Sequence, residues 1–301
     1  MLPFDPSELT RYGGLTLVAR TVVEGFLSGT HRSRFEGLSA EFAGHRPYSS
    51  GDERSRIDWR ASGKTDRFVV KEFERESNLK TFLVLDASGS MRFRGQQAVT
   101  KFEYAQRVAA SLAYLMLAQL DAVGLVVHDT RIRQLIQPRA TSKHLLGLLR
   151  GLETVQPGGE TGLAEVWHEL AIKHLKRPGL VVLISDGFDD PTRLARAFHA
   201  LRHRKQIVRF FHILAPEEIE FPFDRPTRFR DMERIGEEVR VDARRLRSEY
   251  RANFDAYCAT LRRLAQDLQI DYHLLRTDEP VDHALGVYLA GRKRPGKPES
   301  G

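Results

Sequence analysis

The sequence predicts an α/β protein with a doubly wound, mostly parallel central sheet flanked by helices. Short apolar runs, beginning with TFLVLD at 81–86, alternate with long amphipathic segments, beginning with KFEYAQRVAASLAYLMLAQL at 101–120. An unbroken apolar run is typical of a strand covered on both faces, and strands that alternate with helices favour a parallel sheet. The chain has 301 residues, of which 41% are hydrophobic, and this is enough to bury a sizeable core.

The remaining elements follow in the same alternation. Strands are expected at 122–129, 131–137, 179–186, 207–214 and 270–276, with a tight turn at Asp129-Thr130. Helices are expected at 142–155, 163–175, 189–204, 244–268 and 281–292. In the third of these helices, Asp190 is suited to cap the helix and Pro191 to fill its first position. A polar insertion at 216–243 contains a hairpin predicted to turn at Ile235-Gly236-Glu237.

Composition divides the chain into three parts. Residues 1–79 form a short helical lead and a β-rich segment that is rich in Arg, Ser, Gly and aromatic residues. Residues 80–292 form the α/β domain, and the polar tail at 293–301 is expected to be disordered.

Charge and cysteine usage narrow the function classes. The 47 basic and 40 acidic residues give a net charge of +7. They are interleaved without a run of five like charges, which favours a mixed solvated surface over a nucleic-acid-binding surface. Cys258 is the only cysteine, so internal disulfides and cysteine metal clusters are excluded.

No targeting or membrane segment is expected. The N-terminus MLPFDPSELT has neither the basic head nor the apolar core of a signal peptide. The longest apolar region, SLAYLMLAQLDAVGLVV, is interrupted by Gln119 and Asp121, so it falls short of a membrane span. We therefore expect a soluble cytoplasmic protein.

Oxygen-bearing side chains follow the strands at one edge of the predicted sheet. In FLVLDASGSM, at 82–91, Asp86 ends a strand and Ser88 and Ser90 follow it. Asp186 ends the strand at 179–186, and Thr161 lies in the loop PGGETGL. Ligands of open α/β sheets bind beyond the carboxyl ends of the strands, so these segments are expected to converge.

The residue types suit a hard cation. Magnesium takes about six oxygen ligands and usually keeps several waters. Two carboxylates and three neutral hydroxyls leave such an ion much of its positive charge. It then favours one more anionic oxygen, which a partner's Glu or Asp can deliver. We therefore predict that Asp86, Ser88, Ser90, Thr161 and Asp186 bind Mg²⁺ or Mn²⁺.

Other interpretations of these residues remain open. Asp86 alone could cap a helix through an Asx turn. A haloacid-dehalogenase phosphatase needs a second aspartate where Ser88 stands, and a serine-hydrolase elbow is absent. The segment SGKT, at 62–65, lacks the glycine of a P-loop, because Asp58 occupies that position. A metal-dependent phosphoester hydrolase and a basic nucleic-acid-binding protein stay as alternative functions.

The site pattern resembles the metal-ion-dependent adhesion site of von Willebrand factor A domains. Asp86, Ser88 and Ser90 match its DxSxS motif, and Thr161 and Asp186 match its later threonine and aspartate. The fold implied is von Willebrand factor A-like. The function implied is metal-dependent protein interaction without catalysis.

A wider resemblance runs from about His31 to Arg292, to the bacterial domain-of-unknown-function 58 family. Its N-terminal signature is carried here between Arg46 and Trp59, by Arg46, Tyr48, Gly51, Asp52, Arg54 or Arg56, Ile57, Asp58 and Trp59. The resemblance implies a partner, a MoxR-type AAA+ ATPase, and a role as its adaptor in assembly or maturation of client protein complexes. The signature segment is either a recognition surface or, as we favour, a β-rich flap whose charges pair internally.

Overall fold

The computed structural model describes residues 14–28, 41–47, 62–63, 69–74, 80–234 and 236–290. By their contacts the residues divide into two compact units, one of residues 27–78 and one of residues 1–26 together with 79–301. The tail at 293–301 and, within the signature, Tyr48 and Gly51 to Trp59 lie outside the described residues. Lys64 and Thr65 of the SGKT segment also lie outside them.

The central sheet has six strands in the order β10-β7-β6-β3-β4-β5. All neighbours are parallel except β5, which pairs antiparallel with β4. This confirms the predicted mostly parallel sheet. The strands are β3 (Lys80–Asp86), β4 (Ala122–His128), β5 (Ile132–Arg139), β6 (Leu180–Ser185), β7 (Ile207–Leu214) and β10 (Asp271–Arg276).

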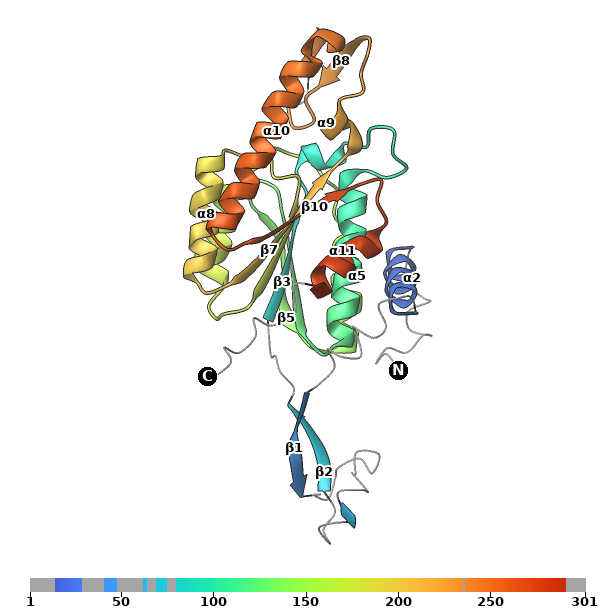
Figure 1. Ribbon diagram of the computed structural model, residues 1–301, viewed down its shortest axis with the longest axis vertical. Coiled ribbons are helices and arrows are strands. Elements are labelled where there is room, and N and C mark those ends of the chain that lie inside the picture. Colours follow the sequence, from blue (N-terminus) through green and yellow to red (C-terminus); the bar gives the residue numbers. More distant parts are fainter. Residues whose placement is uncertain are drawn as a thin grey trace, which may run out of the picture. The chain divides into compact units, whose positions relative to one another are not determined.

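Helices cover both faces of the sheet (Figure 1). One face carries α5 (Lys101–Ala118), α6 (Ser142–Glu153) and α11 (Val281–Ala290). The other carries α7 (Leu163–Glu169), α8 (Pro191–His203) and part of α10 (Ala243–Asp267). Helix α2 (Gly14–Ser28) belongs to the same unit through Gly14–Phe26. No helix in the described ranges is both long and apolar enough for a membrane crossing.

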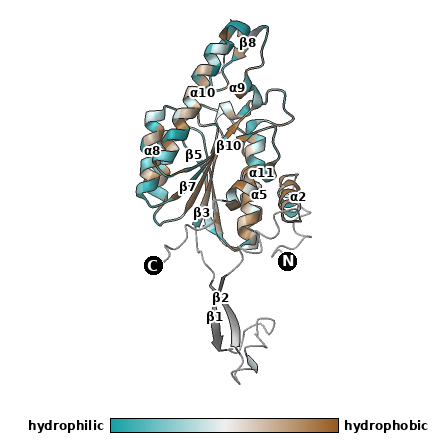
Figure 2. Ribbon diagram, viewed as in Figure 1, coloured by the Kyte–Doolittle hydropathy of each residue, from teal (hydrophilic) through white to brown (hydrophobic). Residues whose placement is uncertain are grey.

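The core follows from the alternation of side chains along the buried strands. Phe82 and Val84 of β3 face the layer of α7, α8 and α10, where Trp167 stacks on Phe198 with ring centroids 5.7 Å apart. Leu83, between them in sequence, points to the opposite face and is also buried. Figure 2 shows the brown strands of the sheet and, beside them, teal residues along α8 and α10.

Two local elements differ from the expectation. The predicted helix at 163–175 is α-helical to Glu169 and continues as a π-helical turn, η3 (Leu170–His174). The amide of Leu175 donates to the carbonyl of Leu170, five residues earlier, at 3.1 Å. This turn therefore holds one residue more than an α-helical turn. Both leucines are buried. The short helix α9 (Pro216–Glu220) was not predicted. It begins with proline at its first position and Glu218 bonding the amide of Ala215 at 2.8 Å.

Smaller elements complete the fold. In the second unit, β1 (Glu41–Pro47) pairs antiparallel with β2 (Val69–Glu74). In the larger unit, the predicted hairpin is present as β8 (Pro226–Arg230) and β9 (Glu238–Asp242), and Ile235 of its loop lies outside the described residues. Figure 1 shows β8, α9 and one end of α10 together beyond the carboxyl ends of the parallel strands.

Candidate metal centre

Asp86 lies fully buried at the carboxyl end of β3. Its Oδ1 accepts a hydrogen bond from the amide of Ser88 at 2.8 Å, and its Oδ2 accepts one from the hydroxyl of Ser185 at 2.7 Å. The first bond is the Asx turn of the alternative interpretation, and the short 3-10 helix η2 (Gly89–Arg92) follows it. The turn fixes the backbone after Asp86 and so holds Ser88 and Ser90 close to its carboxylate in space.

Four of the five predicted site residues lie together through their side chains. The hydroxyl oxygens of Ser88 and Ser90 are 3.1 Å apart. Ser90 in turn hydrogen-bonds Asp186 through its side chain, and the carboxylates of Asp86 and Asp186 are close enough to repel one another. Residues from β3, its following turn and the end of β6 therefore form one cluster.

Thr161 reaches the cluster through its backbone rather than through its hydroxyl. The amide of Gly158 donates to the carbonyl of Ala87 at 2.8 Å, and the amide of Gly89 donates to the carbonyl of Gly159 at 2.9 Å. These bonds hold the loop of Thr161 against the Asp86 turn. The amide and the hydroxyl of Thr161 both donate to the carboxylate of Glu233.

A buried lysine faces the cluster. Lys101, at the first position of α5, is 1% exposed, and its ammonium donates to Asp186 at 2.8 Å and to Glu218 at 2.6 Å. Burial alone acts to lower the pKa of Lys101, but the two carboxylates outweigh it and raise that pKa. The lysine is therefore a permanent cation built into the site.

The carboxylates carry more charge than this lysine offsets. Burial, reinforced by repulsion from Asp186, raises the pKa of Asp86 to about 7. Burial also acts to raise the pKa of Asp186, but Lys101 overcomes it and lowers that pKa. When Asp86, Asp186 and Glu218 are all ionised, three negative charges meet one ammonium. The excess of two is the charge of one divalent cation.

Two buried histidines beside the site are held neutral. Burial lowers the pKa of His128 and of His212 to about 4. His128 Nε2 accepts from the indole N–H of Trp167 at 3.1 Å, and its Nδ1 lies 3.2 Å from the carbonyl oxygen of Asp129. His212 Nε2 lies 2.6 Å from the carbonyl oxygen of Asp186, and its Nδ1 lies 2.6 Å from the hydroxyl of Tyr272. Both rings are thus fully engaged as structural groups.

The donor set fits a hard divalent cation. Carboxylate and hydroxyl oxygens are the ligands that such ions prefer, and the paired hydroxyls of Ser88 and Ser90 present two neutral oxygens beside two acids. Within the described ranges, no three His, Cys, Asp or Glu side chains are grouped to hold a metal. A site built from two carboxylates and hydroxyls has fewer than three such groups.

Sequence reasoning missed Lys101, Ser185, Glu218 and Glu233, because each joins the site across 72 residues or more. For Ser185 a clue was available, since it directly precedes Asp186. For Lys101, Glu218 and Glu233, nothing in the local pattern distinguishes them from surface charges.

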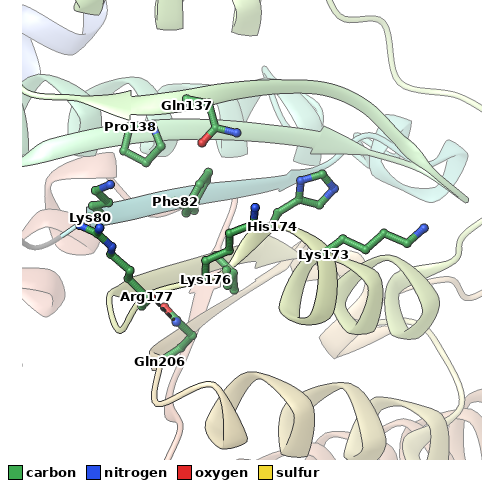
Figure 3. A pocket seen from close by; sticks show the side chains of 10 residues that line it. Lys80, Phe82, Gln137, Pro138, Lys173, His174, Lys176, Arg177 and Gln206 are labelled. Atoms are coloured by element: carbon green, nitrogen blue, oxygen red, sulfur yellow. Dashed lines mark hydrogen bonds between the residues drawn. The ribbon is translucent and has the colours of Figure 1, made fainter.

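A second feature of the unit is a basic pocket of about 420 Å³ at the amino end of β3 (Figure 3). It is lined by Lys80, Lys173, His174, Lys176 and Arg177 above an apolar floor that includes Phe82. Lys173 pairs with Glu169 at 2.9 Å, whereas no carboxylate in the described part of the chain pairs with Lys80, Lys176 or Arg177. The pocket is suited to an anion.

Comparison with known proteins places the chain in a family. It is 26% identical to the uncharacterized protein Mb1516 of Mycobacterium bovis, over 96% of this chain and 91% of that one. The solved structure of BatB from Bacteroides thetaiotaomicron has a TM-score of 0.48 and 16% identity, over 71% of this chain and 97% of that one. A von Willebrand factor type A protein from Catenulispora acidiphila has a TM-score of 0.43 and 14% identity, over 71% of this chain and 42% of that one. The family model "Protein of unknown function DUF58" matches residues 44–260, and the chain belongs to this family.

Proposed function

We propose that the chain is a non-enzymatic protein-interaction module whose site binds Mg²⁺ or Mn²⁺. The observation that supports this most is the buried cluster of three carboxyl groups, Asp86, Asp186 and Glu218, around one lysine, with two hydroxyls 3.1 Å apart. Asp86, Ser88, Ser90, Thr161 and Asp186 would hold the ion. When bound, the ion supplies positive charge for a carboxylate of a partner protein, whose desolvation it offsets.

The same contacts favour binding over catalysis. The two histidines of the site are neutral and use both ring nitrogens within the fold. A general base needs a free nitrogen or oxygen that reaches the reacting proton, and these two rings do not offer one.

The partner we propose is a MoxR-type AAA+ ATPase in the cytoplasm, together with a client protein whose assembly or maturation the pair assists. Support for this partner is the resemblance of the chain to the DUF58 family, whose model it matches over residues 44–260. A surface that recognises a single carboxylate suits an adaptor, because it can engage and release a protein as the ion and its ligand exchange.

The test is binding of the full chain to the MoxR-type ATPase from the same genome, without nucleotide, in Mg²⁺ and in EDTA. We expect binding in Mg²⁺, loss in EDTA, and loss in Thr161→Ala. Thr154→Ala is the matched control, since the hydroxyl of Thr154 bonds only carbonyls of α6. Equal binding with and without Mg²⁺ excludes the metal-bridged interaction.

A second candidate function, nucleic-acid binding, is favoured by the basic pocket. Lys80, Lys176 and Arg177 lack carboxylate partners among the described residues, and phosphate contacts by such cations give salt-dependent affinity. Fluorescence anisotropy with single-stranded DNA and RNA at low and physiological salt tests it, with the double variant Lys176→Gln and Arg177→Gln. An unchanged anisotropy at both salt concentrations removes this function.

A further inference from the structure

The loop of the β8–β9 hairpin lies directly on the proposed metal site. The carbonyl oxygen of Met232 lies 3.4 Å from Nη2 of Arg92. A Cβ atom added to Gly89 would lie 2.3 Å from that same oxygen, so only glycine admits the loop at this distance. Arg234 Nε lies 3.3 Å from a carboxylate oxygen of Glu160, beside Thr161. The loop therefore touches both segments that carry the DxSxS motif and the threonine.

Asp231 shapes the loop so that Glu233 faces the site. One carboxylate oxygen of Asp231 accepts from the amide of Glu233 at 2.8 Å and from the amide of Arg234 at 3.0 Å. These two hydrogen bonds lower the pKa of Asp231. An aspartate that bonds amides two and three residues ahead fixes a tight turn, so the direction of Glu233 is set locally.

Both carboxylate oxygens of Glu233 accept hydrogen bonds from Thr161. Its Oε2 accepts from the amide of Thr161 at 3.0 Å, and its Oε1 accepts from the hydroxyl of the same residue. A carboxylate that meets one residue through both oxygens is held in a defined orientation. Thr161 is also the residue whose hydroxyl the proposed function gives to the ion.

We infer that Glu233 is an internal competitor of the partner at this centre, because its carboxylate holds the amide and the hydroxyl of Thr161. It occupies from within the chain the threonine that the proposed function gives to the ion, and a partner must displace it. This inference rests on the proposed function. It adds that Thr161 is occupied in the absence of a partner and that binding removes Glu233 from this threonine.

The hairpin is built for such a displacement. The hairpin is anchored by rings at Phe229, the fourth of the five residues of β8. Phe229 lies 5.7 Å from Phe221 and 5.2 Å from Phe223, and Phe221 stacks on Tyr250 at 4.3 Å. This aromatic cluster lines a cavity of about 440 Å³. The tip is held by polar contacts, and each strand has five residues that are largely exposed. A two-stranded hairpin is only marginally stable by itself, so the loop at 231–237 can leave the site while Phe229 stays anchored.

The first test uses metal-free protein and amide-resolved hydrogen exchange. In Glu233→Ala the amide of Thr161 loses its acceptor, and we expect it to exchange at least about tenfold faster than in the wild type. Glu237→Ala is the matched control, because Glu237 is an exposed acid of the same loop whose side chain has no described partner on the site. Equal exchange of Thr161 in Glu233→Ala and wild type overturns the inference.

The second test counts the waters on bound Mn²⁺ by water-proton relaxation. If Glu233 withholds the hydroxyl of Thr161 from the ion, Glu233→Ala loses about one inner-sphere water and binds Mn²⁺ roughly tenfold more tightly, which corresponds to about 1.4 kcal/mol. Unchanged relaxation and affinity overturn this competition. A wild type that binds no Mn²⁺ contradicts the proposed function, while the exchange experiment still decides whether Glu233 occupies Thr161.

Discussion

The ammonium nitrogen of Lys101 lies 2.8 Å from a carboxylate oxygen of Asp186, and both side chains are buried. The same ammonium bonds Glu218 and lies 5.5 Å from the ring centre of Phe188. One of the predicted metal ligands is therefore already tied to a fixed cation. The lysine sets the orientation of Asp186. A metal ion would neutralise the negative charge of the carboxylates that the single ammonium does not balance.

Replacing this lysine is expected to lower the free energy of unfolding. Lys101→Met leaves Asp186 and Glu218 buried without their cation, and removal of one partner from a buried pair typically destabilises by about 3–5 kcal/mol. Urea unfolding at pH 8 measures this loss of stability. Lys173→Met removes an exposed lysine that is paired with Glu169 and should change stability by less than about 1 kcal/mol. A similar small loss for both variants contradicts the role of Lys101.

The raised pKa of Asp86 predicts a pH-dependent stability difference. Between about pH 4 and pH 7 the folded state keeps a proton on Asp86 that the unfolded state has lost, so this group makes metal-free protein less stable as pH rises. Asp86→Asn removes that trend. Because His128 and His212 are present in both proteins, their opposite contributions in this window cancel in the difference.

We therefore expect the free energy of unfolding of metal-free Asp86→Asn, relative to that of the wild type, to rise between pH 5 and pH 8 by on the order of 2–4 kcal/mol. The lowered pKa of Asp186 acts only below its ordinary value, outside this window. Urea unfolding at several pH values measures the difference, which Mg²⁺ should reduce at pH 8. A difference that does not vary between pH 5 and pH 8 contradicts the assignment.

The close approach of the hairpin loop predicts a specific effect of Gly89→Ala. The added methyl group meets the carbonyl oxygens of Met232 and Gly159, so it should push the loop away and speed exchange at Thr161 as Glu233→Ala does. Gly158→Ala is its control, since nothing lies within 4 Å of a Cβ there. Hydrogen exchange of residues 157–163 measures both. Protection of Thr161 that survives Gly89→Ala argues against this close contact in solution.

Tyr257 is expected to hold the loop that follows Asp186. Its hydroxyl oxygen lies 2.6 Å from the carbonyl oxygen of Gly187 and 2.7 Å from that of Asp189, and it accepts from the amide of Asp189 at 3.1 Å. Tyr257→Phe should lower stability by about 1–3 kcal/mol and speed exchange at 187–190. Tyr250→Phe loses a single bond, to the carbonyl of Glu218, and should leave that loop protected. Equal exchange at 187–190 in both variants rules out the proposed role.

Much of the fold was predictable because its determinants are local. The apolar run of β3 and the amphipathic pattern of α5 are decided by neighbouring residues, and the structure confirms both. The start of α8 is as expected, with Asp190 bonding the amides of Thr192 and Arg193. The π-helical turn at 170–174 was not predicted, because the composition of the segment favours a helix without distinguishing the spacing of its hydrogen bonds.

The candidate site divides in the same way. The motif of Asp86, Ser88 and Ser90 is contiguous, and its convergence with Asp186 follows from neighbouring parallel strands. Lys101 and Glu233 meet the site only through tertiary packing, 85 residues from Asp186 and 72 residues from Thr161 respectively. A single charged residue in a polar segment carries no pattern that distinguishes such a contact from a solvated charge.

The central claim is that this cluster binds a divalent cation, and calorimetric titration of Mn²⁺ into metal-free full-length protein tests it most directly. We predict binding of one ion per chain in the wild type, and loss of that binding in Ser88→Ala and Ser90→Ala. Thr154→Ala should bind like the wild type. No binding to the wild type, or equal binding to the serine variants, would contradict the account.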